Sequence, residues 1–539
     1  MKIIIIGGGI AGLSTAFSLC QESELDIEIY EKDDDIGGQA RSQYGERCFT
    51  EYSWRIFGES YDNINHIVKA IGADKFFAPL KYPCIIKNDQ IDDGSLNATN
   101  LLYQIYNSSD DLEAVDRLLK MSMMCKDRAI NDYDHIHAYH YFNKNPIVQT
   151  ILGPYLGLEA NKVSLSGFMK NVYSTTTHNS ISKCGTRITK HPTQQSLFDP
   201  WKKYLLSKGV KIFTNTEMSD IIMRDNIIQS VVMNGVEKKA DEFIFALSLP
   251  GLLSASHNIS HLPTISNLTK LLPCLQLYFT INLYFSEEIG SLDADKGSKS
   301  YCSELVIVDE DLPWKPIIQK KRLWKNNYLN KCDEKIKDVW NVGFLDYNVG
   351  MRHKKYLRQC SKQEAIEEGI YQLKQSGYIK NMMGDKDFDD LLIGIEVWYQ
   401  FVNDRNNKLV SLNPKFSTNV NSQKYMPNTT SSDLPSNMYL SGYYVQSSMG
   451  GVSMESSCET GLSAAEAVLE KLGKKSNLPY IHNNEYIHSL VVPFAMTDKL
   501  LYSAGVPPLT DAISPLLLII ICFILLVLIV VCAHKYANL

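Results

Sequence analysis

The first nineteen residues, MKIIIIGGGIAGLSTAFSL, constrain the fold of this chain more than any other stretch. Ile3 to Ile6 are β-branched and uninterrupted, which is typical of a parallel strand covered on both faces. Three glycines follow at once, and residues 10–20 have the small and apolar side chains of a buried helix. A strand that ends in glycines and continues as a helix predicts the first unit of an α/β fold.

The spacing of these glycines predicts a dinucleotide site. Gly7, Gly9 and Gly12 fit the pattern G-x-G-x-x-G. In this pattern the first glycine permits a tight turn, the second lets the backbone approach a pyrophosphate, and the third lets the helix pack closely on the strand. A second strand, DIEIYE, ends nineteen residues after Gly12 at Glu31, where a carboxylate can accept from a ribose hydroxyl. An unrelated glycine-rich turn is the alternative, and the strand, helix and acid together disfavour it. The candidate contacts are Gly7, Gly9, Ala11, Gly12 and Glu31.

The next residues, KDDDIGGQARS, discriminate between dinucleotides. Gly37, Gly38 and Arg41 resemble the G-G-x-x-R-S segment of the flavin amine oxidase and phytoene desaturase superfamily. In that superfamily the segment lies along FAD, with the arginine near the pyrophosphate and ribityl chain. A nicotinamide enzyme has no need of it, so the resemblance implies FAD as the cofactor.

The resemblance covers about residues 1–472 and is strongest to the phytoene and zeta-carotene desaturases of plant and cyanobacterial type. EYSWRIFGESYDNI resembles a family stretch and retains Glu51, Phe57, Tyr61 and Asn63. PTQQSLFDPWKKYLLSKGV resembles the segment that precedes the second FAD-contacting strand. The resemblance places the backbone near Met218 against the adenine.

Two further matches lie near the end of this region. NMYLSGYY resembles a family strand that ends in L-x-G-D and contains Gly442. SMESSCETGLSAAEAV resembles the helix whose N-terminus faces the flavin pyrimidine edge, and it begins with Met454 and Glu455. A helix N-terminus would stabilise the negative charge of reduced flavin with free N–H groups and its dipole.

The chain also departs from the family pattern. Arg55 stands where the family has histidine, Tyr443 replaces the aspartate of L-x-G-D, and Ser456 and Ser457 replace Gly-Ala. We expect FAD binding to survive these changes, whereas retention of a carotenoid reaction does not follow from the resemblance.

The resemblance implies an α/β, two-domain FAD-dependent fold: a Rossmann-type FAD domain assembled from separated segments, and a substrate domain with a mixed sheet. A C-terminal transmembrane helix is expected in addition. The predicted boundaries are FAD-binding segments at 1–80, 191–255 and 411–472, substrate-domain segments at 81–190 (helical) and 256–410, a linker with a possible interfacial segment at 473–512, and the transmembrane helix at 513–533.

Charge and cysteine usage narrow the function classes. The net charge of −6 gives no electrostatic reason to expect nucleic acid binding. Twelve cysteines are scattered without a C-x-x-C pair. Such irregular spacing indicates reduced thiols in a cytosolic protein rather than a disulfide framework.

The stretch PLLLIIICFILLVLIVVCA, residues 515–533, has 19 residues and no charge. As a helix it would extend roughly 28 Å, close to the thickness of the hydrocarbon core of a bilayer. It predicts a single-pass anchor, and with no signal peptide expected, the FAD domain is placed on the cytosolic side. Residues 489–507 are interrupted by Thr497, Asp498 and Lys499 and cannot span. They either lie in the membrane interface or pack on the enzyme, and both alternatives stay open.

Two other groups of residues are candidates for function. His135, His137 and His140 resemble a metal site, yet a solvated helix face explains them better, so no metal is predicted. Trp398 and Tyr399 either flank the flavin or pack within a sheet. No catalytic residue is assigned, because the flavin carries the redox chemistry in this superfamily.

The function expected from these features is that of a membrane-anchored FAD-dependent oxidoreductase. It would dehydrogenate or desaturate a lipophilic, isoprenoid-like small molecule by hydride transfer to flavin, with the lipid bilayer as its other partner. One alternative is a flavin amine oxidase that produces hydrogen peroxide. Another is a flavin-binding membrane protein without redox turnover.

Overall fold

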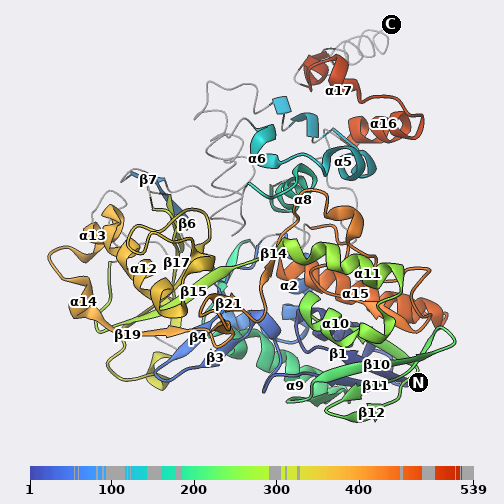
Figure 1. Cartoon of the computed structure of the whole chain (residues 1–539), viewed down its shortest axis with the longest axis horizontal. Coiled ribbons are helices and arrows are strands. Elements are labelled where there is room, and N and C mark those ends of the chain that lie inside the picture. Colours follow the sequence, from blue (N-terminus) through green and yellow to red (C-terminus); the bar gives the residue numbers. More distant parts are fainter. Residues whose placement is uncertain are drawn as a thin grey trace, which may run out of the picture.

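The computed structural model places two sheet-based domains side by side, with a helical region at one end (Figure 1). It describes residues 1–80 except 54 and 59, 83–87, 90–92, 116–142 except 118 and 122, 161–176, 185–290, 305–309, 312–324, 328–449, 453–475, 492–521 except 516, and 524.

A five-stranded parallel sheet forms the centre of the first domain, in the order β23–β13–β1–β2–β9. Its strands come from three distant parts of the chain, which confirms the α/β prediction; the exact domain boundaries stay a prediction. The strands are β1 (Lys2–Ile6), β2 (Asp26–Tyr30), β9 (Lys211–Phe213), β13 (Glu242–Phe245) and β23 (Met438–Leu440).

The isoleucine run of β1 is apolar throughout because both faces of this sheet are covered. Ile3 and Ile5 pack in a core with α1 (Ile10–Leu19), α9 (Asp199–Ser207) and α15 (Met454–Lys471). Ile4 and Ile6 point the other way, into a core with β10 (Met218–Arg224), β11 (Ile227–Met233), α10 (Leu249–Ala255) and α11 (Pro263–Leu268). Strand β12 (Val236–Lys238) completes the small antiparallel sheet β10–β11–β12.

Helices α1 and α15 cross at very close range beneath the first glycine turn. A Cβ added to Gly461 would lie 2.2 Å from the carbonyl oxygen of Ala11, so only glycine permits this approach. The Thr15 hydroxyl donates to the carbonyl of Gly461 at 2.8 Å. The two segments predicted to contact the cofactor are therefore held together by backbone packing. Gly209 and Gly473 follow α9 and α15 with φ of +84° and +69°, as expected of glycines that end helices.

The second domain contains a seven-stranded mixed sheet, in the order β19–β15–β18–β17–β16–β6–β7, in which only the β16–β6 pair is parallel. Helices α12 (Lys362–Gln375), α13 (Gly377–Met383) and α14 (Phe388–Leu391) share its apolar core. The strands are β6 (Pro83–Lys87), β7 (Gln90–Asp92), β15 (Tyr278–Phe285), β16 (Leu305–Asp309), β17 (Ile317–Lys320), β18 (Asp338–Leu345) and β19 (Leu392–Val397).

Short elements connect the two domains. Helix α2 (Asp62–Ala70) packs against α15. The remaining short strands pair antiparallel as β3 (Ser42–Tyr44) with β4 (Phe49–Glu51), β5 (Phe77–Pro79) with β8 (Arg187–Thr189), β14 (Leu275–Gln276) with β22 (Lys415–Phe416), and β20 (Phe401–Asn403) with β21 (Leu409–Ser411).

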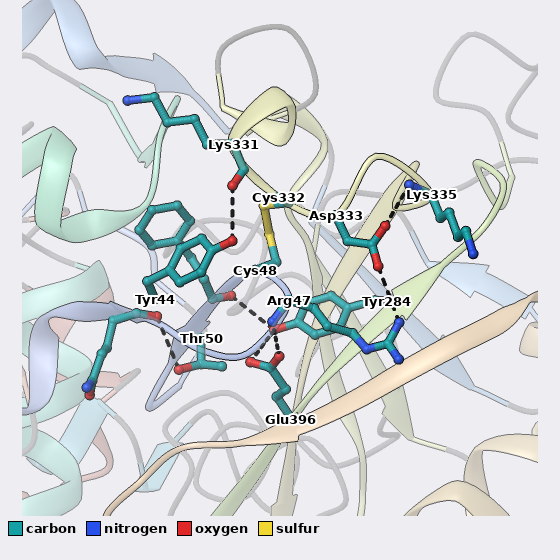
Figure 2. The surroundings of a disulfide bond; sticks show 12 residues. Tyr44, Arg47, Cys48, Thr50, Tyr284, Lys331, Cys332, Asp333, Lys335 and Glu396 are labelled. Atoms are coloured by element: carbon teal, nitrogen blue, oxygen red, sulfur yellow. Dashed lines mark hydrogen bonds and ion pairs between the residues drawn. A yellow bond between two sulfur atoms is a disulfide. The ribbon is translucent and has the colours of Figure 1, made fainter.

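A disulfide between Cys48 and Cys332 corrects the expectation that the thiols are reduced. Figure 2 shows that it joins the β3–β4 hairpin to the loop before β18, where Tyr44 donates to the carbonyl of Lys331 and Arg47 pairs with Asp333. The partners are 284 residues apart in sequence, so their spacing carries no signal of the pairing. The free cysteines of the described chain are all buried, at positions 20, 125, 274, 360 and 458.

Helices α5 (Lys126–Tyr133), α6 (Ala138–Tyr141), α8 (Leu165–Thr176), α16 (Val492–Ser503) and α17 (Leu509–Ala512) lie at one end of the molecule (Figure 1). Within the described ranges, no helix combines the length and apolarity needed to cross a bilayer. Most of the predicted span 513–533 lies outside those ranges, so it stays a prediction.

Candidate functional site

The three glycines of the first turn have three different surroundings. Gly7 has φ +109°, and a Cβ there would lie 2.2 Å from the carbonyl oxygen of Ala246. A Cβ on Gly12 would lie 2.0 Å from the carbonyl oxygen of Gly7. A Cβ on Gly9, in contrast, would meet no atom closer than the Cα of Gly38, at 4.0 Å. Gly7 and Gly12 thus serve the turn and the packing, and Gly9 is the one of the three with space for a Cβ, in contact with Gly38.

The second glycine pair lies directly beside Gly9. The N–H of Gly37 donates to the carbonyl of Gly8 at 2.8 Å, which ties the two turns together. Gly37 and Gly38 have φ of +116° and +56°, a region that favours glycine. Because neither residue has a side chain, the two turns pack backbone against backbone: a Cβ added to Gly38 would lie 3.3 Å from the Cα of Gly9.

Glu31 lies at the end of β2, beside the first turn. Its carboxylate accepts from the N–H of Gly8 at 2.7 Å and of Asp33 at 2.9 Å. Burial raises the pKa of this carboxyl above its ordinary value. The N–H of Thr216 donates to the Glu31 carbonyl at 2.9 Å, which brings the chain just before Met218 alongside. The Met218 side chain is buried in the core, so only its backbone is left for the predicted adenine contact.

Arg41 is buried among groups from both domains. Its guanidinium donates to the carbonyl of Asp35 at 2.9 Å, to Asp34 at 2.7 Å and to the Tyr399 hydroxyl at 3.1 Å. Its Nε is buried and has no hydrogen-bond partner in the described part of the chain. A buried N–H donor without a partner is uncommon in native proteins, and a charged group of a ligand is one way to satisfy it.

Arg55, the departure from the family histidine, also supports the second glycine turn. Its guanidinium donates to the carbonyls of Gln39 and Ala40, directly after Gly38. Its backbone N–H donates to the Gln319 side chain, whose amide donates back to the Arg55 carbonyl, both at 2.7 Å. Arg55 therefore fixes the turn to strand β17 of the second domain.

Glu51, four residues earlier, joins three parts of the chain. It accepts from the N–H of Thr193 at 3.0 Å and from the Thr193 hydroxyl at 2.6 Å, and it forms an ion pair with Lys321. Burial opposes its ionisation, but Lys321 and Arg55 hold the pKa of Glu51 below its ordinary value. The retained acid thus has a positioning role where the domains meet.

Gly442 and Tyr443 follow β23. Gly442 has φ +130°, and its N–H donates to the Thr460 hydroxyl of α15 at 3.0 Å. The Tyr443 hydroxyl accepts from the N–H of Leu249 at 3.1 Å, and its ring packs 5.4 Å from that of Phe416. Tyr443 therefore caps the start of α10 and brings no negative charge in place of the family aspartate.

Helix α15 begins at Met454, and its N-cap Ser453 accepts from the N–H of Ser456 at 3.0 Å. The Glu455 carboxylate accepts from the N–H groups of Asn63 and Ile64, at 2.8 and 3.0 Å, at the start of α2. Burial raises the pKa of Glu455 to about 8. The side chain of Glu455 thus serves α2, and its predicted cofactor contact is left to its backbone.

Sequence reasoning missed Lys415, which lies on β22 beside this region. The Gln39 side chain donates to the carbonyls of Asn413 and Pro414, so β22 adjoins the second glycine turn. Lys415 Nζ lies 5.0 Å from the centre of the Tyr278 ring. Burial and the nearby Arg55 guanidinium lower the pKa of Lys415 from its ordinary value to about 7. A single lysine between proline and phenylalanine carries no motif that could have identified it.

The remaining candidates lie elsewhere. Trp398 is fully buried in the second-domain core, which agrees with the packing alternative. The Tyr399 hydroxyl donates to Asp33 at 2.7 Å and contacts Arg41, so it supports the loop after β2. The rings of His137 and His140 contact edge to face, with centroids 5.6 Å apart. Over the described residues, no group of three potential metal ligands is gathered.

Comparison with known proteins agrees with this geometry. Residues 5–71 match the family model described as an NAD(P)-binding Rossmann-like domain. A carotenoid phi-ring synthase of Chlorobaculum tepidum is 22% identical over 258 residues, covering 43% of this chain and 40% of that protein. A zeta-carotene desaturase of Solanum lycopersicum is 23% identical over 292 residues, which cover 47% of this chain and 49% of that protein. The chain thus spans half or less of the length of these curated relatives.

Solved structures share the fold over nearly the whole of their own length. Cyclohexylamine oxidase from Brevibacterium oxydans has a TM-score of 0.57 at 14% identity, covering 88% of this chain and 99% of its own. Putrescine oxidase has a TM-score of 0.59 at 11% identity, and the match covers 87% of this chain and 99% of that structure. The fold is therefore that of the FAD-dependent amine oxidases, and the relatives support membership of the amine oxidase and desaturase superfamily.

The residues present fit FAD. Gly9 and Gly38 carry no side chain that would keep a pyrophosphate from the backbone of the two turns. Glu31 lies beside the same turn, at the position of a ribose acceptor. The prediction of a dinucleotide site is confirmed, and the superfamily relatives support FAD as the dinucleotide.

Proposed function

We propose that this chain is an FAD-dependent oxidoreductase that dehydrogenates a lipophilic, isoprenoid-like substrate. The observation that carries the redox assignment is the pair of facing glycine turns, Gly9 and Gly38, tied together by the hydrogen bond from the N–H of Gly37 to the carbonyl of Gly8. Bound FAD would supply the hydride acceptor. The printed functions of the carotenoid relatives support the class of substrate.

The chain's own residues would position the cofactor and exclude water. Arg55 holds the second glycine turn against β17, and Glu51 ties that region to Thr193 and Lys321. The aromatic and aliphatic side chains of the seven-stranded sheet are buried in the core of the second domain, next to this region.

The Arg55 guanidinium favours this substrate class over an amine. It adjoins the second glycine turn, as does Lys415, whose pKa of about 7 leaves it partly protonated at neutral pH. A protonated amine brought to this position would be repelled by them. We therefore rank amine oxidation below lipid dehydrogenation.

We further propose that residues 513–533 anchor the enzyme in a membrane, with the FAD domain on the cytosolic side. Its support is the uncharged stretch 515–533 together with exposed apolar residues that lead up to it. An anchor would hold the enzyme at the surface from which a lipophilic substrate partitions.

Purification of the full chain in mild detergent tests the proposal. After acid precipitation, we expect the yellow colour in the supernatant and FAD as the released compound, because the stretch from Tyr439 to Met454, where a covalent thioether link to flavin would be expected, has no cysteine. Anaerobic addition of lipid extracts should then bleach the flavin spectrum. Bleaching by amines with release of hydrogen peroxide would favour the amine oxidase alternative. Bound FAD that no extract reduces would favour a non-redox role.

A further inference from the structure

The stretch before the predicted anchor concentrates exposed apolar side chains. Of the 17 large apolar residues exposed in the described structure, eight lie between residues 496 and 524. Leu500 and Met496, at 74% and 66% exposure, are the two most exposed of all. A soluble surface rarely gathers such residues without a partner. The eight are Met496, Leu500, Val506, Leu509, Leu517, Ile520, Ile521 and Ile524.

Helix α16 is fixed to the body of the enzyme by its polar side. Asp498 accepts from Arg128 Nε at 3.0 Å and from the N–H of Cys125 at 2.9 Å. Both members of this ion pair are only 5% exposed at the side chain. Since a buried charge that loses its partner is costly, this contact sets which face of α16 points outward.

Further contacts hold the same orientation. Arg128 also donates to the carbonyl of Val506 at 2.7 Å, and its guanidinium lies 4.9 Å from the centre of the Tyr502 ring. The Tyr502 hydroxyl accepts from Asn131 at 2.9 Å. Beyond α17, the Ser514 hydroxyl donates to Asp116 at 2.6 Å.

The outward face of α16 is apolar with a cation at its side. Met496 and Leu500 are one helical turn apart and share that face, while Asp498 and Ala495 are buried on the opposite one. Lys499 is exposed beside Leu500. Apolar residues flanked by lysine are typical of a helix in the headgroup region of a membrane.

We infer that the exposed face of α16, carrying Met496 and Leu500, is a second membrane contact that lies in the bilayer interface. This rests on the proposed anchor, because the exposed apolar residues continue through Val506, Leu509 and Leu517 into the uncharged stretch 515–533. The lipid bilayer is thus the occupant that this face and the following chain can share. The contacts of Asp498 with Arg128 and Cys125 hold one face of α16 to the enzyme and leave the face with Met496 and Leu500 exposed. Packing on the enzyme and contact with the membrane interface are therefore compatible.

The test uses the full chain labelled at position 500 with an environment-sensitive fluorophore. The variant Leu500→Cys is reconstituted in vesicles of phosphatidylcholine and phosphatidylserine, with and without a nitroxide-labelled lipid as quencher. Met496→Cys gives a second reading on the same face. Val236→Cys, on β12 and 55% exposed, is the matched control because it lies at the other end of the molecule (Figure 1). The unsubstituted chain, treated identically, gives the signal of the native cysteines.

We expect the vesicles to float with the protein, and quenching several-fold stronger at positions 496 and 500 than at position 236. Flotation with equal, weak quenching at all three positions would overturn the interfacial role of α16 and leave the anchor standing. Failure of the full chain to float with vesicles would overturn the anchor and the α16 contact together.

Discussion

At the scale of single residues, a substitution of Gly9 should impair cofactor binding without impairing folding. Gly9 has an ordinary φ of −76°, and its Cβ would meet no atom closer than the Cα of Gly38. We expect Gly9→Val to fold yet bind no FAD, because the side chain would occupy the pyrophosphate position. Gly12→Val, whose Cβ would meet the Gly7 carbonyl, should fail to fold. Circular dichroism and acid-released flavin distinguish the two, and full FAD occupancy in a folded Gly9→Val protein would contradict the site.

Lys415 gives a prediction about pH. Its pKa is about 7 in the native state, below that of an exposed lysine in the unfolded chain. Between these values the unfolded chain binds the extra proton, so native stability should rise with pH above 7, by at most roughly 1 kcal/mol per unit. We expect Lys415→Met to stabilise the protein at pH 7, with the gain shrinking towards pH 9. Urea unfolding at both pH values measures this, with the exposed Lys424→Met as control.

At the scale of elements, the link between α15 and α2 depends on one side chain. Glu455→Ala would leave the buried N–H groups of Asn63 and Ile64 without their acceptor. We expect a loss of about 1–3 kcal/mol in the free energy of unfolding. Glu470→Ala, at the exposed end of the same helix, should change stability little. Equal unfolding midpoints of the two variants in urea would show that Glu455 does not hold α2.

The sequence predicted those features that depend on adjacent residues or that match a known family pattern. The strand, turn and helix of residues 2–19 follow from adjacent residues, and the parallel sheet follows from the apolar run of β1. The N-terminus of α15 was expected to face the cofactor with its N–H groups; that the Glu455 carboxylate caps α2 was not foreseen, because this contact depends on how two helices cross. Lys415 and the partner of Cys48 become apparent only when segments far apart in sequence meet.

At the scale of the whole molecule, the Cys48–Cys332 disulfide joins the β3–β4 hairpin to the loop before β18 across 284 residues of sequence. A link over so long a loop restricts the unfolded chain strongly, and losing it typically costs about 2–5 kcal/mol. It also removes one reason for placing the FAD domain in the cytosol, since disulfides persist mainly in oxidising compartments. The predicted orientation then needs a direct test, such as protease treatment of sealed vesicles.

The pairing itself can be measured on the isolated protein. We expect a thiol-alkylating reagent, added to the protein unfolded without reductant, to leave Cys48 and Cys332 unmodified, and to modify both after reduction. Reductant should also lower the melting temperature of the native chain, and it should have no such effect on the variant Cys48→Ala with Cys332→Ala. Because the five buried free cysteines are common to both proteins, they cannot account for that difference. Alkylation of Cys48 without reduction would show that the two domains are held together by their non-covalent contacts alone.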